Sequence, residues 1–292
     1  MKTILIATDF SEAARNAGIY GVELAKAFNA RVILFNAWYP VAAIALEGTL
    51  VLSWEEYCSL AKEQLRNEIS AINPGNQVTI DTAFEEGAPA ETILQAALKN
   101  KADLIIAGMK GTGKAMRKFL GSTATDLASK TTIPLVIVPE EAKFITPSAI
   151  ALANEDDLEP NSDPQLLNAL KEIAERFHSR LYLVRVVRNE FHEVYEVKNK
   201  PLHLQKIIRT LDPQYELIQG KDITHTLNNF IESHSVNLLA LLPHKYSAWD
   251  KLFYKSTTRS MAFATHIPLL VLPGLFEIKD DHKQEEELNT RI

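Results

Sequence analysis

The sequence of 292 residues is notable first for what it lacks. It holds a single cysteine, Cys58, so no disulfide can form within the chain. No apolar run reaches the length of about 18 residues that a transmembrane helix needs. The first residues run from a short apolar stretch directly into Asp9, which is not the layout of a signal peptide. The net charge of −6 gives no basic surface for nucleic acid or for an acidic membrane. We therefore expect a soluble, cytoplasmic protein with neither partner.

Several sequence signatures of catalysis are also missing. There is no Gly-x-Ser-x-Gly nucleophile elbow and no Gly-x4-Gly-Lys-Ser/Thr phosphate loop. All 8 histidines follow residue 177, which suggests a metal site with His225, His234 and His244 as ligands. No pair of them has the compact spacing of a metal motif, so solvated or packed histidines are favoured and no metal site is predicted. Cys58 has no basic partner nearby in the sequence and is predicted to be a buried, inert thiol.

The chain repeats itself. The segment Ile133-Pro-Leu-Val-Ile-Val-Pro139 returns 134 positions later as Ile267-Pro-Leu-Leu-Val-Leu-Pro273. The same offset pairs Phe119 with Phe253, and the Ser-Thr dipeptide at 122–123 with that at 256–257. Chance similarity between two apolar strands explains the shared prolines poorly and the shared Ser-Thr worse. The repeat predicts a duplicated domain.

In the first half, apolar runs and turn residues predict strands alternating with helices. The strands are expected at Thr3–Thr8, Arg31–Ala37, Val78–Phe84, Asp103–Gly108 and Ile133–Val138. The helices are expected over Ser11–Phe28, from Ser53, from Pro89 and from Ser122. Asp9 and Glu12 have the spacing of a capping box, which favours a helix start at that point.

The second half repeats this order. Its strands are expected at Ala149–Ala153, Arg180–Val187, Tyr215–Gln219, Asn237–Leu242 and Ile267–Leu272. Its helices are expected from Ser162, after Pro201, over Thr224–Ser233 and from Ser256. Apolar strands that alternate with helices indicate the α/β class, with two doubly wound, parallel, five-stranded sheets in tandem. The expected units are a domain over residues 1–140, a second domain over 147–276, and a charged, mobile tail over 277–292.

Chemistry is expected at the carboxyl edge of the first sheet, where open parallel sheets bind ligands. The loop after the fourth strand reads Gly-Met-Lys-Gly-Thr-Gly-Lys-Ala-Met-Arg-Lys-Phe-Leu-Gly-Ser-Thr over residues 108–123. Glycines allow close approach of the backbone, and a helix that opens at Ser122 offers free N–H groups to an anion. The physics fits a phosphate site, but a glycine-rich loop with solvated lysines fits equally well.

The spacing Gly108-x2-Gly111-x9-Gly121-Ser122 resembles the nucleotide-binding signature of the universal stress protein family. The first-strand ending Ala7-Thr8-Asp9-Phe10-Ser11 and the Ile-Pro-Leu-Val-Ile-Val-Pro strand are also similar to that family, and both halves share the resemblance. The chain therefore resembles a tandem universal stress protein. The resemblance implies the adenine nucleotide alpha hydrolase-like variant of the Rossmann and flavodoxin type of fold, and ATP or AMP, with or without Mg²⁺, as the ligand.

The resemblance also implies roles for individual residues. Asp9 stands where the family places an acid against adenosine, although it could serve only as a helix cap. Ala37 is the nearest match to a residue that meets adenine through its backbone, with a register uncertain by one. The ribose and phosphates would be held by the loop glycines and the Ser-Thr pair, namely Gly108, Gly111, Gly121, Ser122 and Thr123. Paired domains in this family often meet through their fifth strands, so Ile133–Val138 is expected beside Ile267–Leu272.

The second half departs from the signature. Leu242, Lys245 and Lys255 replace the three glycines at the 134 offset, and Asn154 stands in the place of Asp9. We therefore expect one nucleotide per chain, in the first half. The favoured function is a non-catalytic nucleotide-binding regulator or sensor in a stress response, acting on an unknown protein partner, with a homodimer as a further option. The alternatives are an adaptor with an empty pocket and a weak ATP hydrolase, for which only Asp9, Glu85 and Glu86 offer acids at the mouth.

Overall fold

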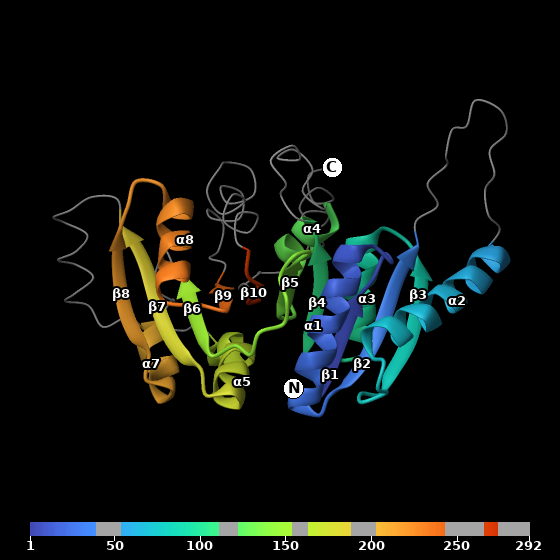
Figure 1. Cartoon of the computed structure of the whole chain (residues 1–292), viewed down its shortest axis with the longest axis horizontal. Helices are drawn as coiled ribbons and strands as arrows, with labels where there is room; N and C mark the ends of the chain where they lie inside the picture. The colour runs from blue at the N-terminus through green and yellow to red at the C-terminus, as the bar shows by residue number, and fades with distance from the viewer. Residues whose placement is uncertain (39–53, 111–121, 154–162, 188–202, 243–265, 274–292) are drawn as a thin grey trace, which may run out of the picture.

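The computed structural model describes residues 1–38, 54–110, 122–153, 163–187, 203–242 and 266–273. These residues form a mixed α/β structure around a single sheet of ten strands in the order β3-β2-β1-β4-β5-β10-β9-β6-β7-β8 (Figure 1). The expected α/β class with a parallel-dominated sheet is confirmed. The two five-stranded sheets predicted from the sequence are joined edge to edge into one.

The strands of the first half are parallel to one another. They are β1 (Thr3–Ala7), β2 (Arg31–Trp38), β3 (Ile80–Glu86), β4 (Leu104–Met109) and β5 (Leu135–Pro139). The strands of the second half are also parallel to one another. They are β6 (Ala149–Ala153), β7 (Arg180–Val187), β8 (Gln214–Gln219), β9 (Leu238–Leu241) and β10 (Leu269–Val271).

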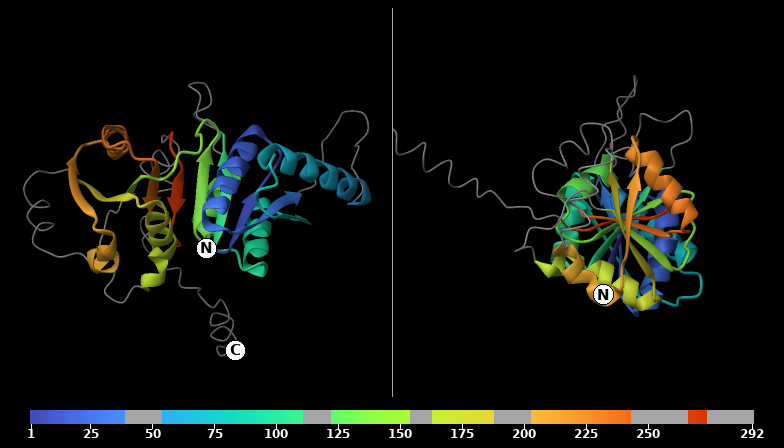
Figure 2. Two further views of the ribbon diagram at one scale, coloured as in Figure 1. Left: turned by 60° about the horizontal axis from the view of Figure 1, so that its bottom comes forward. Right: turned by 90° about the vertical axis from the view of Figure 1, so that its left-hand side faces the viewer.

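Helices cover both faces of this sheet, because alternate residues of each strand point to opposite faces. One apolar layer includes Ile4 and Ile6 and is covered by the helices α1 (Glu12–Phe28), α2 (Trp54–Ile72), α5 (Asn168–Phe177) and α7 (His203–Ile208). The other includes Leu5 and Ala7 and is covered by α3 (Pro89–Lys99), α4 (Ser122–Lys130) and α8 (Ile223–Ser233). Two 3₁₀ turns, η1 (Pro164–Leu167) and η2 (Arg209–Leu211), adjoin α5 and α7. Seen from one end, the strands fan out between the two helical layers (Figure 2, right).

The pairing register of the first half returns in the second. Ile4 lies opposite Leu104 in the β1–β4 pair, and its counterpart Ile150 lies opposite Leu238 in the β6–β9 pair. Ile105 lies opposite Leu135, and Leu239 lies opposite Leu269. The helices α1 and α5 end alike, with Asn29 and His178 both in the left-handed conformation. These matches allow residues of the two halves to be compared one by one.

The two halves meet through β5 and β10, which lie side by side as expected and pair in antiparallel fashion. Both apolar layers run through this pair, since each contains buried residues from the first and the second half. The segment between the halves lies on α1, where the Asn16 side chain donates to the carbonyls of Pro139 (2.9 Å) and Ala142 (2.8 Å). Because β10 takes the free edge of β5, a homodimer through β5 is not open to this chain.

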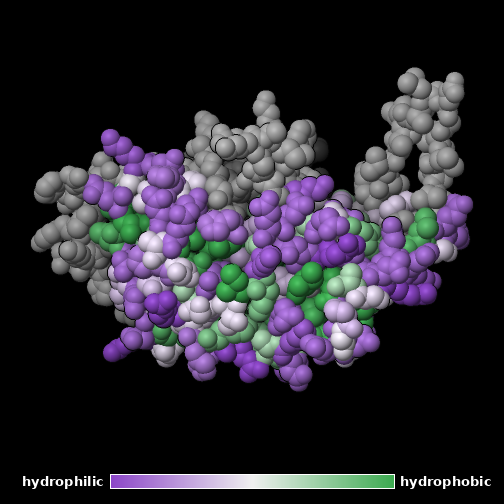
Figure 3. Space-filling view, in the orientation of Figure 1, coloured by the Kyte–Doolittle hydropathy of each residue, from purple (hydrophilic) through white to green (hydrophobic). Residues whose placement is uncertain are grey.

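The face shown in Figure 1 is mainly hydrophilic, with smaller apolar patches, one of which lies over α1 (Figure 3). Ile19 on that helix is 40% exposed. Within the described ranges no helix is long and apolar enough to cross a membrane.

Most predicted boundaries lie within two residues of the observed ones, and the differences are local. The helix expected from Ser162 begins instead as the 3₁₀ turn η1, whose N-cap Asp163 accepts from the N–H of Gln165 (2.8 Å). Cys58, predicted to be buried, is only partly buried, since it lies towards the start of α2. The expected helix from Ser256 and the tail over 277–292 lie outside the described residues.

Candidate functional site

The turn from β1 into α1 is held by three successive side-chain contacts with the backbone. Thr8 Oγ1 accepts from the N–H of Phe10 (3.0 Å), and Asp9 Oδ1 accepts from the N–H of Ser11 (3.0 Å). Ser11 Oγ then accepts from the N–H of Ala14 (3.2 Å), which makes Ser11 the N-cap of α1. Phe10 takes a positive φ of 63°, a conformation that such short side-chain contacts help to hold.

This geometry corrects the predicted capping box. Asp9 and Glu12 have its spacing, but the cap is Ser11, two residues beyond Asp9. Glu12 instead contacts the Arg15 guanidinium at 3.2 Å. Asp9 is exposed, and only its Oδ1 is engaged in the turn in the contacts described. Among the contacts described, the turn therefore uses one carboxylate oxygen of Asp9 and does not engage the other.

A buried amide fixes the end of β1 to β2. Asn36 is 5% exposed, and its Nδ2 donates to the carbonyl of Thr8 at 2.8 Å. The N–H of Thr8 donates in turn to the carbonyl of Phe35 at 2.8 Å. These two bonds extend the contact between β1 and β2 by one residue, and so fix the position at which Asp9 leaves the sheet.

Gly108 lets the start of α1 lie directly on β4. A Cβ added to Gly108 would lie 2.4 Å from the carbonyl oxygen of Ala13 and 2.7 Å from the N of Ala14. Real Cβ atoms do not approach backbone this closely, so any side chain here would displace the first turn of α1. The described geometry thus gives Gly108 a packing role, whereas the sequence suggested direct approach to a ligand.

Ala37 lies at the same sheet edge. It is half-buried on β2 and lies opposite Glu85 of β3. Glu85 contacts the Lys99 ammonium at 3.0 Å, and Glu86 next to it is exposed. Both acids named for the hydrolase alternative are therefore at the edge, and one of them is already paired with a cation.

The helix α4 begins at Ser122, as the sequence predicts, with the half-buried Thr123 in its first turn. In the same turn, the buried hydroxyl of Thr125 has no hydrogen-bond partner among the residues that the structure describes. A buried hydroxyl without a partner costs free energy unless another group satisfies it. The start of α4 therefore offers hydrogen-bonding capacity that its own fold leaves unused, which fits a polar ligand.

The structure brings three of the predicted site residues to one edge. Ala7 lies opposite Phe35, so Asp9, two residues further on, leaves the sheet beside Ala37. Ile6 lies opposite Ile106, so Gly108 lies beside Thr8. Ser122 and Thr123 begin the helix that connects β4 to β5. Gly111 and Gly121 lie outside the described residues. The described part of the site thus consists of strand ends and two helix starts.

Sequence reasoning missed an ion pair that fixes α1 to α2. Arg15 Nη2 lies 2.9 Å from Oε2 of Glu68, and Arg15 Nε also donates to it at 3.2 Å. Glu68 is 2% exposed, and within the described ranges its other oxygen has no hydrogen-bond partner. The pair raises the pKa of the Arg15 guanidinium, first through the hydrogen bond to Glu68 and then through its charge. A salt bridge between two helices has no local sequence pattern. Its one indication in the sequence is an acid, Glu68, among the apolar positions of its helix.

The corresponding edge of the second half is built differently. Leu241 lies opposite Val271 as Ala107 lies opposite Ile137, so Leu242 takes the place of Gly108. Leu242 is 7% exposed, and the α-helix of α5 begins only at Asn168, the counterpart of Ile19 in α1. Among the described residues, α5 therefore starts farther from this edge than α1 does from its own. Lys245, Lys255 and Asn154 lie outside the described residues.

The histidines that suggested a metal are not brought together. His225 lies in the first turn of α8, and His234 caps its other end, stacked on Phe230 at a centroid distance of 4.0 Å. Nine residues of α-helix separate their positions by about 13 Å. His244 is outside the described residues, and within those ranges no three His, Cys, Asp or Glu side chains form a metal-binding group.

Comparison with known proteins identifies the family of the first half. The sequence model of the universal stress protein family matches residues 1–139. A universal stress protein of Thermus aquaticus is 34% identical over 137 residues, which are 47% of this chain and 98% of that protein. One from Methanocaldococcus jannaschii is 32% identical over 147 residues, which are 49% of this chain and 84% of that protein.

A solved structure extends the likeness of fold to both halves. The crystal structure of a universal stress protein from Archaeoglobus fulgidus superposes with a TM-score of 0.70 at 15% identity, covering 92% of this chain and 97% of that one. At this identity the likeness concerns the fold. Together with the sequence relatives, which are matched over nearly their full length, these findings show that the chain belongs to the universal stress protein family.

Proposed function

We propose that the chain binds one adenine nucleotide, ATP or AMP, at the carboxyl edge of its first half and acts as a regulator or sensor in a stress response. The observation that carries the proposal is the meeting of three strand ends and two helix starts at that edge, with the exposed Asp9 among them. The ligand would be held by the residues expected from the sequence: Asp9, Ala37, Gly108, Gly111, Gly121, Ser122 and Thr123.

The physical chemistry of the edge supports such a ligand. Peptide N–H groups at the start of a helix attract phosphate oxygens, and α4 starts at this edge. The Thr125 hydroxyl in the same turn is buried without a partner in the described part of the chain, and is a further polar group for a ligand or its bound water. The turn at Thr8–Ser11 is fixed by its own hydrogen bonds, so Asp9 would be preorganised for contact with the ligand. Gly108 would act through α1, by holding its first turn against β4.

We further propose that the chain contains two universal stress protein domains, over residues 1–140 and 147–276, of which only the first binds nucleotide. The equal pairing registers of the two halves support the division. The buried Leu242 in the place of Gly108 supports the loss of the second site. The second domain would then serve as the partner that covers the edge of β5.

The proposed activity is binding without efficient catalysis. Hydrolysis would require Mg²⁺ and a group that orients the attacking water. Of the two acids on β3, Glu85 is engaged by Lys99, and an acid at the position of Asp9 would face the adenosine side. Weak ATP hydrolysis and a role as an adaptor without nucleotide are the alternatives that the experiment below separates.

The test is mass spectrometry of small molecules released from the purified, denatured protein, together with calorimetric titration of the emptied protein with ATP and AMP. The expected result is about one adenine nucleotide per chain, corresponding to a single working site. Two per chain would mean that the second half binds as well. No released nucleotide and no heat on titration would leave the adaptor. Phosphate release that requires Mg²⁺ and persists at saturating ATP would indicate a hydrolase.

A matched pair of variants locates the site. Gly111→Val should abolish binding, because a side chain would prevent the close approach of the backbone that the family signature implies. Lys245→Val changes the corresponding position of the second half and should leave one nucleotide per chain. Unchanged affinity in Gly111→Val, with the fold verified by circular dichroism, would contradict the assignment of the site.

A further inference from the structure

Among the described residues, seven other than glycine take a positive φ, and Phe10 is the one large apolar residue of the seven. The left-handed conformation brings the Cβ of an L-residue close to the following carbonyl oxygen, so for a bulky side chain it is a true outlier. Strained backbone of this kind persists only where surrounding contacts enforce it, and it gathers at ligand sites. Phe10 lies between Asp9 and the N-cap Ser11, which places the strain at the proposed site.

The other six residues have an ordinary reason for this conformation. The N–H of each donates to the carbonyl three residues earlier, at or just beyond the end of a helical element. They are all polar, and they are Asn29, Asn76, Lys101, His178, Asp212 and Ser235. Left-handed residues commonly terminate helices in this way. Phe10 instead precedes a helix, and its N–H donates to the Thr8 hydroxyl oxygen at 3.0 Å.

Packing of the Phe10 side chain accounts for the conformation at this position. Phe10 is half-buried, and it packs against the apolar layer that α1 and α2 cover. Asp9, the residue before it, is exposed, and its Oδ1 accepts from the N–H of Ser11. The turn thus keeps one side chain in the interior and its neighbour at the surface. Because the ring is packed in the layer, the turn cannot rotate without withdrawing it.

We propose that Phe10 is a positioning residue for the nucleotide: its packed ring keeps the turn left-handed, and the turn keeps Asp9 towards the ligand. Phe10 acts through Asp9 and does not touch the nucleotide. The inference rests on the proposed function, because it assigns a cause to the placement of Asp9 at that site. Such preorganisation raises affinity, since a group that is already in place loses little freedom on binding.

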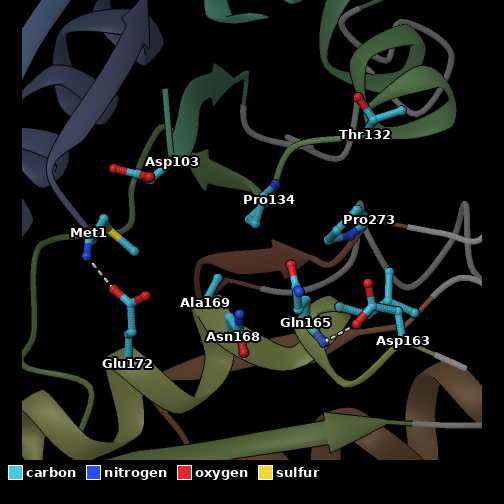
Figure 4. A pocket seen from close by; sticks show the side chains of 11 residues that line it. Met1, Asp103, Thr132, Pro134, Asp163, Gln165, Asn168, Ala169, Glu172 and Pro273 are labelled. Carbon is cyan, nitrogen blue, oxygen red and sulfur yellow. Dashed lines mark hydrogen bonds and ion pairs between the residues drawn. The ribbon is translucent and has the colours of Figure 1, made fainter. Parts of the chain in front are cut away.

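The opposite, amino edge of the first half provides a control position. A cavity of about 380 Å³ lies there, with the carboxylates of Asp103, Asp163 and Glu172 on its wall (Figure 4). Even with the Met1 amino group, which pairs with Glu172, this lining is negatively charged and repels an anionic nucleotide. Lys101, two residues before Asp103, takes a φ of 53° just beyond the end of α3. A change at Lys101 therefore alters a left-handed residue away from the proposed nucleotide site.

The test is calorimetric titration of variants of the full chain, emptied of nucleotide, with ATP and with AMP. Phe10→Leu keeps an apolar side chain in the layer and should bind within about threefold of the parent affinity. Phe10→Ala removes the ring and should weaken binding about tenfold or more. The loss should be equal for ATP and AMP, because Asp9 would meet the adenosine that the two share. Lys101→Gly, the control, should leave both affinities unchanged.

Phe10→Gly separates the backbone conformation from the packing of the ring. Glycine adopts the left-handed conformation without steric cost, so this variant should unfold at a higher urea concentration than Phe10→Ala. Its affinity should be no higher than that of Phe10→Ala, because glycine also lacks the ring and leaves the turn freer to move. The more stable variant thus gains nothing in binding, which a residue with only a structural role would not produce. Phe10→Gly also replaces Phe10→Ala if that variant fails to fold.

The outcomes separate this inference from the function on which it rests. Parent affinity in Phe10→Ala or Phe10→Gly would overturn it while leaving nucleotide binding in place. A loss confined to ATP would also overturn it, because the effect would then lie at the phosphates. Affinity that rises from Phe10→Ala to Phe10→Gly in step with stability would overturn it in favour of a structural role alone. No binding by the parent protein would refute the proposed function, and this inference with it.

Discussion

Val136 and Leu270 lie opposite each other at the centre of the antiparallel pair β5–β10. On either side Leu135 lies opposite Val271 and Ile137 lies opposite Leu269, and these are corresponding positions of the two halves. The seam therefore has the self-complementary register of a two-fold interface, although it is formed within one chain. Both central residues are fully buried, and the apolar layers on the two faces continue across them.

The continuity of the core predicts that the halves lose stability together. Leu270→Ala should lower the free energy of unfolding by about 2–5 kcal/mol, because it leaves a cavity at the seam. In hydrogen exchange, β1 of the first half should lose protection along with β6 of the second. Leu60→Ala, at a position 46% exposed, is the control and should change stability by about 0.5 kcal/mol or less. Loss of protection confined to β6–β10 would show that the halves unfold separately.

The contact of Gly108 with α1 predicts a linked loss of stability and binding. Gly108→Ala forces a Cβ against the Ala13 carbonyl, so stability should fall by about 1–3 kcal/mol. Nucleotide affinity should fall about tenfold, which equals about 1.4 kcal/mol, since the turn that carries Asp9 moves with α1. The comparison is Gly75→Ala, where an added Cβ meets only the flexible side chain of Gln77 at 3.1 Å.

Urea unfolding and calorimetric titration of these two glycine variants measure both effects. If Gly108→Ala retains the affinity and stability of the parent protein, the assigned packing contact is wrong. If stability falls while affinity is unchanged, the position of the first turn of α1 does not matter for the ligand. Gly75→Ala should behave as the parent protein in both assays, which guards against a general effect of replacing glycine.

The fold could be predicted from the sequence because its signals are local and repeated. Strands such as Ala149–Ala153 and Arg180–Val187 are mainly apolar runs, and the observed bounds equal the predicted ones. The repeated Ile-Pro strand predicts the duplication, and the family resemblance implies the meeting of β5 with β10. Such features depend on few residues at fixed spacing, which one sequence displays directly.

The details of the site depend on geometry that spacing does not specify. Asp9 and Ser11 are both good N-cap residues, and only the path of the turn decides that Ser11 caps α1. Gly108 fits a ligand loop and a tight helix contact equally well until the position of Ala13 is known. The partnership of Arg15 with Glu68 joins residues far apart in the chain, so no local pattern announces it.

The ion pair between α1 and α2 predicts an asymmetric response to mutation. Arg15→Met leaves the buried Glu68 carboxylate without its counter-charge and should cost about 2 kcal/mol, a value kept low because Arg15 is 38% exposed. The double variant Arg15→Met with Glu68→Met removes both charges and should regain much of the loss. Urea unfolding at neutral pH measures the cycle. A double variant no more stable than Arg15→Met alone would contradict this account, because the unpaired Glu68 carboxylate would then not be the cause of the loss.

Burial of Tyr20 predicts a loss of stability in alkali. The side chain is 2% exposed on α1 beside Phe144, and burial raises the pKa of its hydroxyl above the ordinary value of 10.0. The folded state then keeps a proton that the unfolded chain gives up, so this contribution to stability is intact below about pH 10 and declines as the pH rises further. Tyr20→Phe keeps the ring contact and removes the titration, so its stability should fall less steeply above about pH 10. Tyr215→Phe is the comparison: burial also raises the pKa of Tyr215, but that side chain is 50% exposed, so the replacement should matter less. Thermal unfolding of the three proteins between neutral pH and pH 11 measures the difference, and parallel curves for Tyr20→Phe and the parent protein would contradict the assignment.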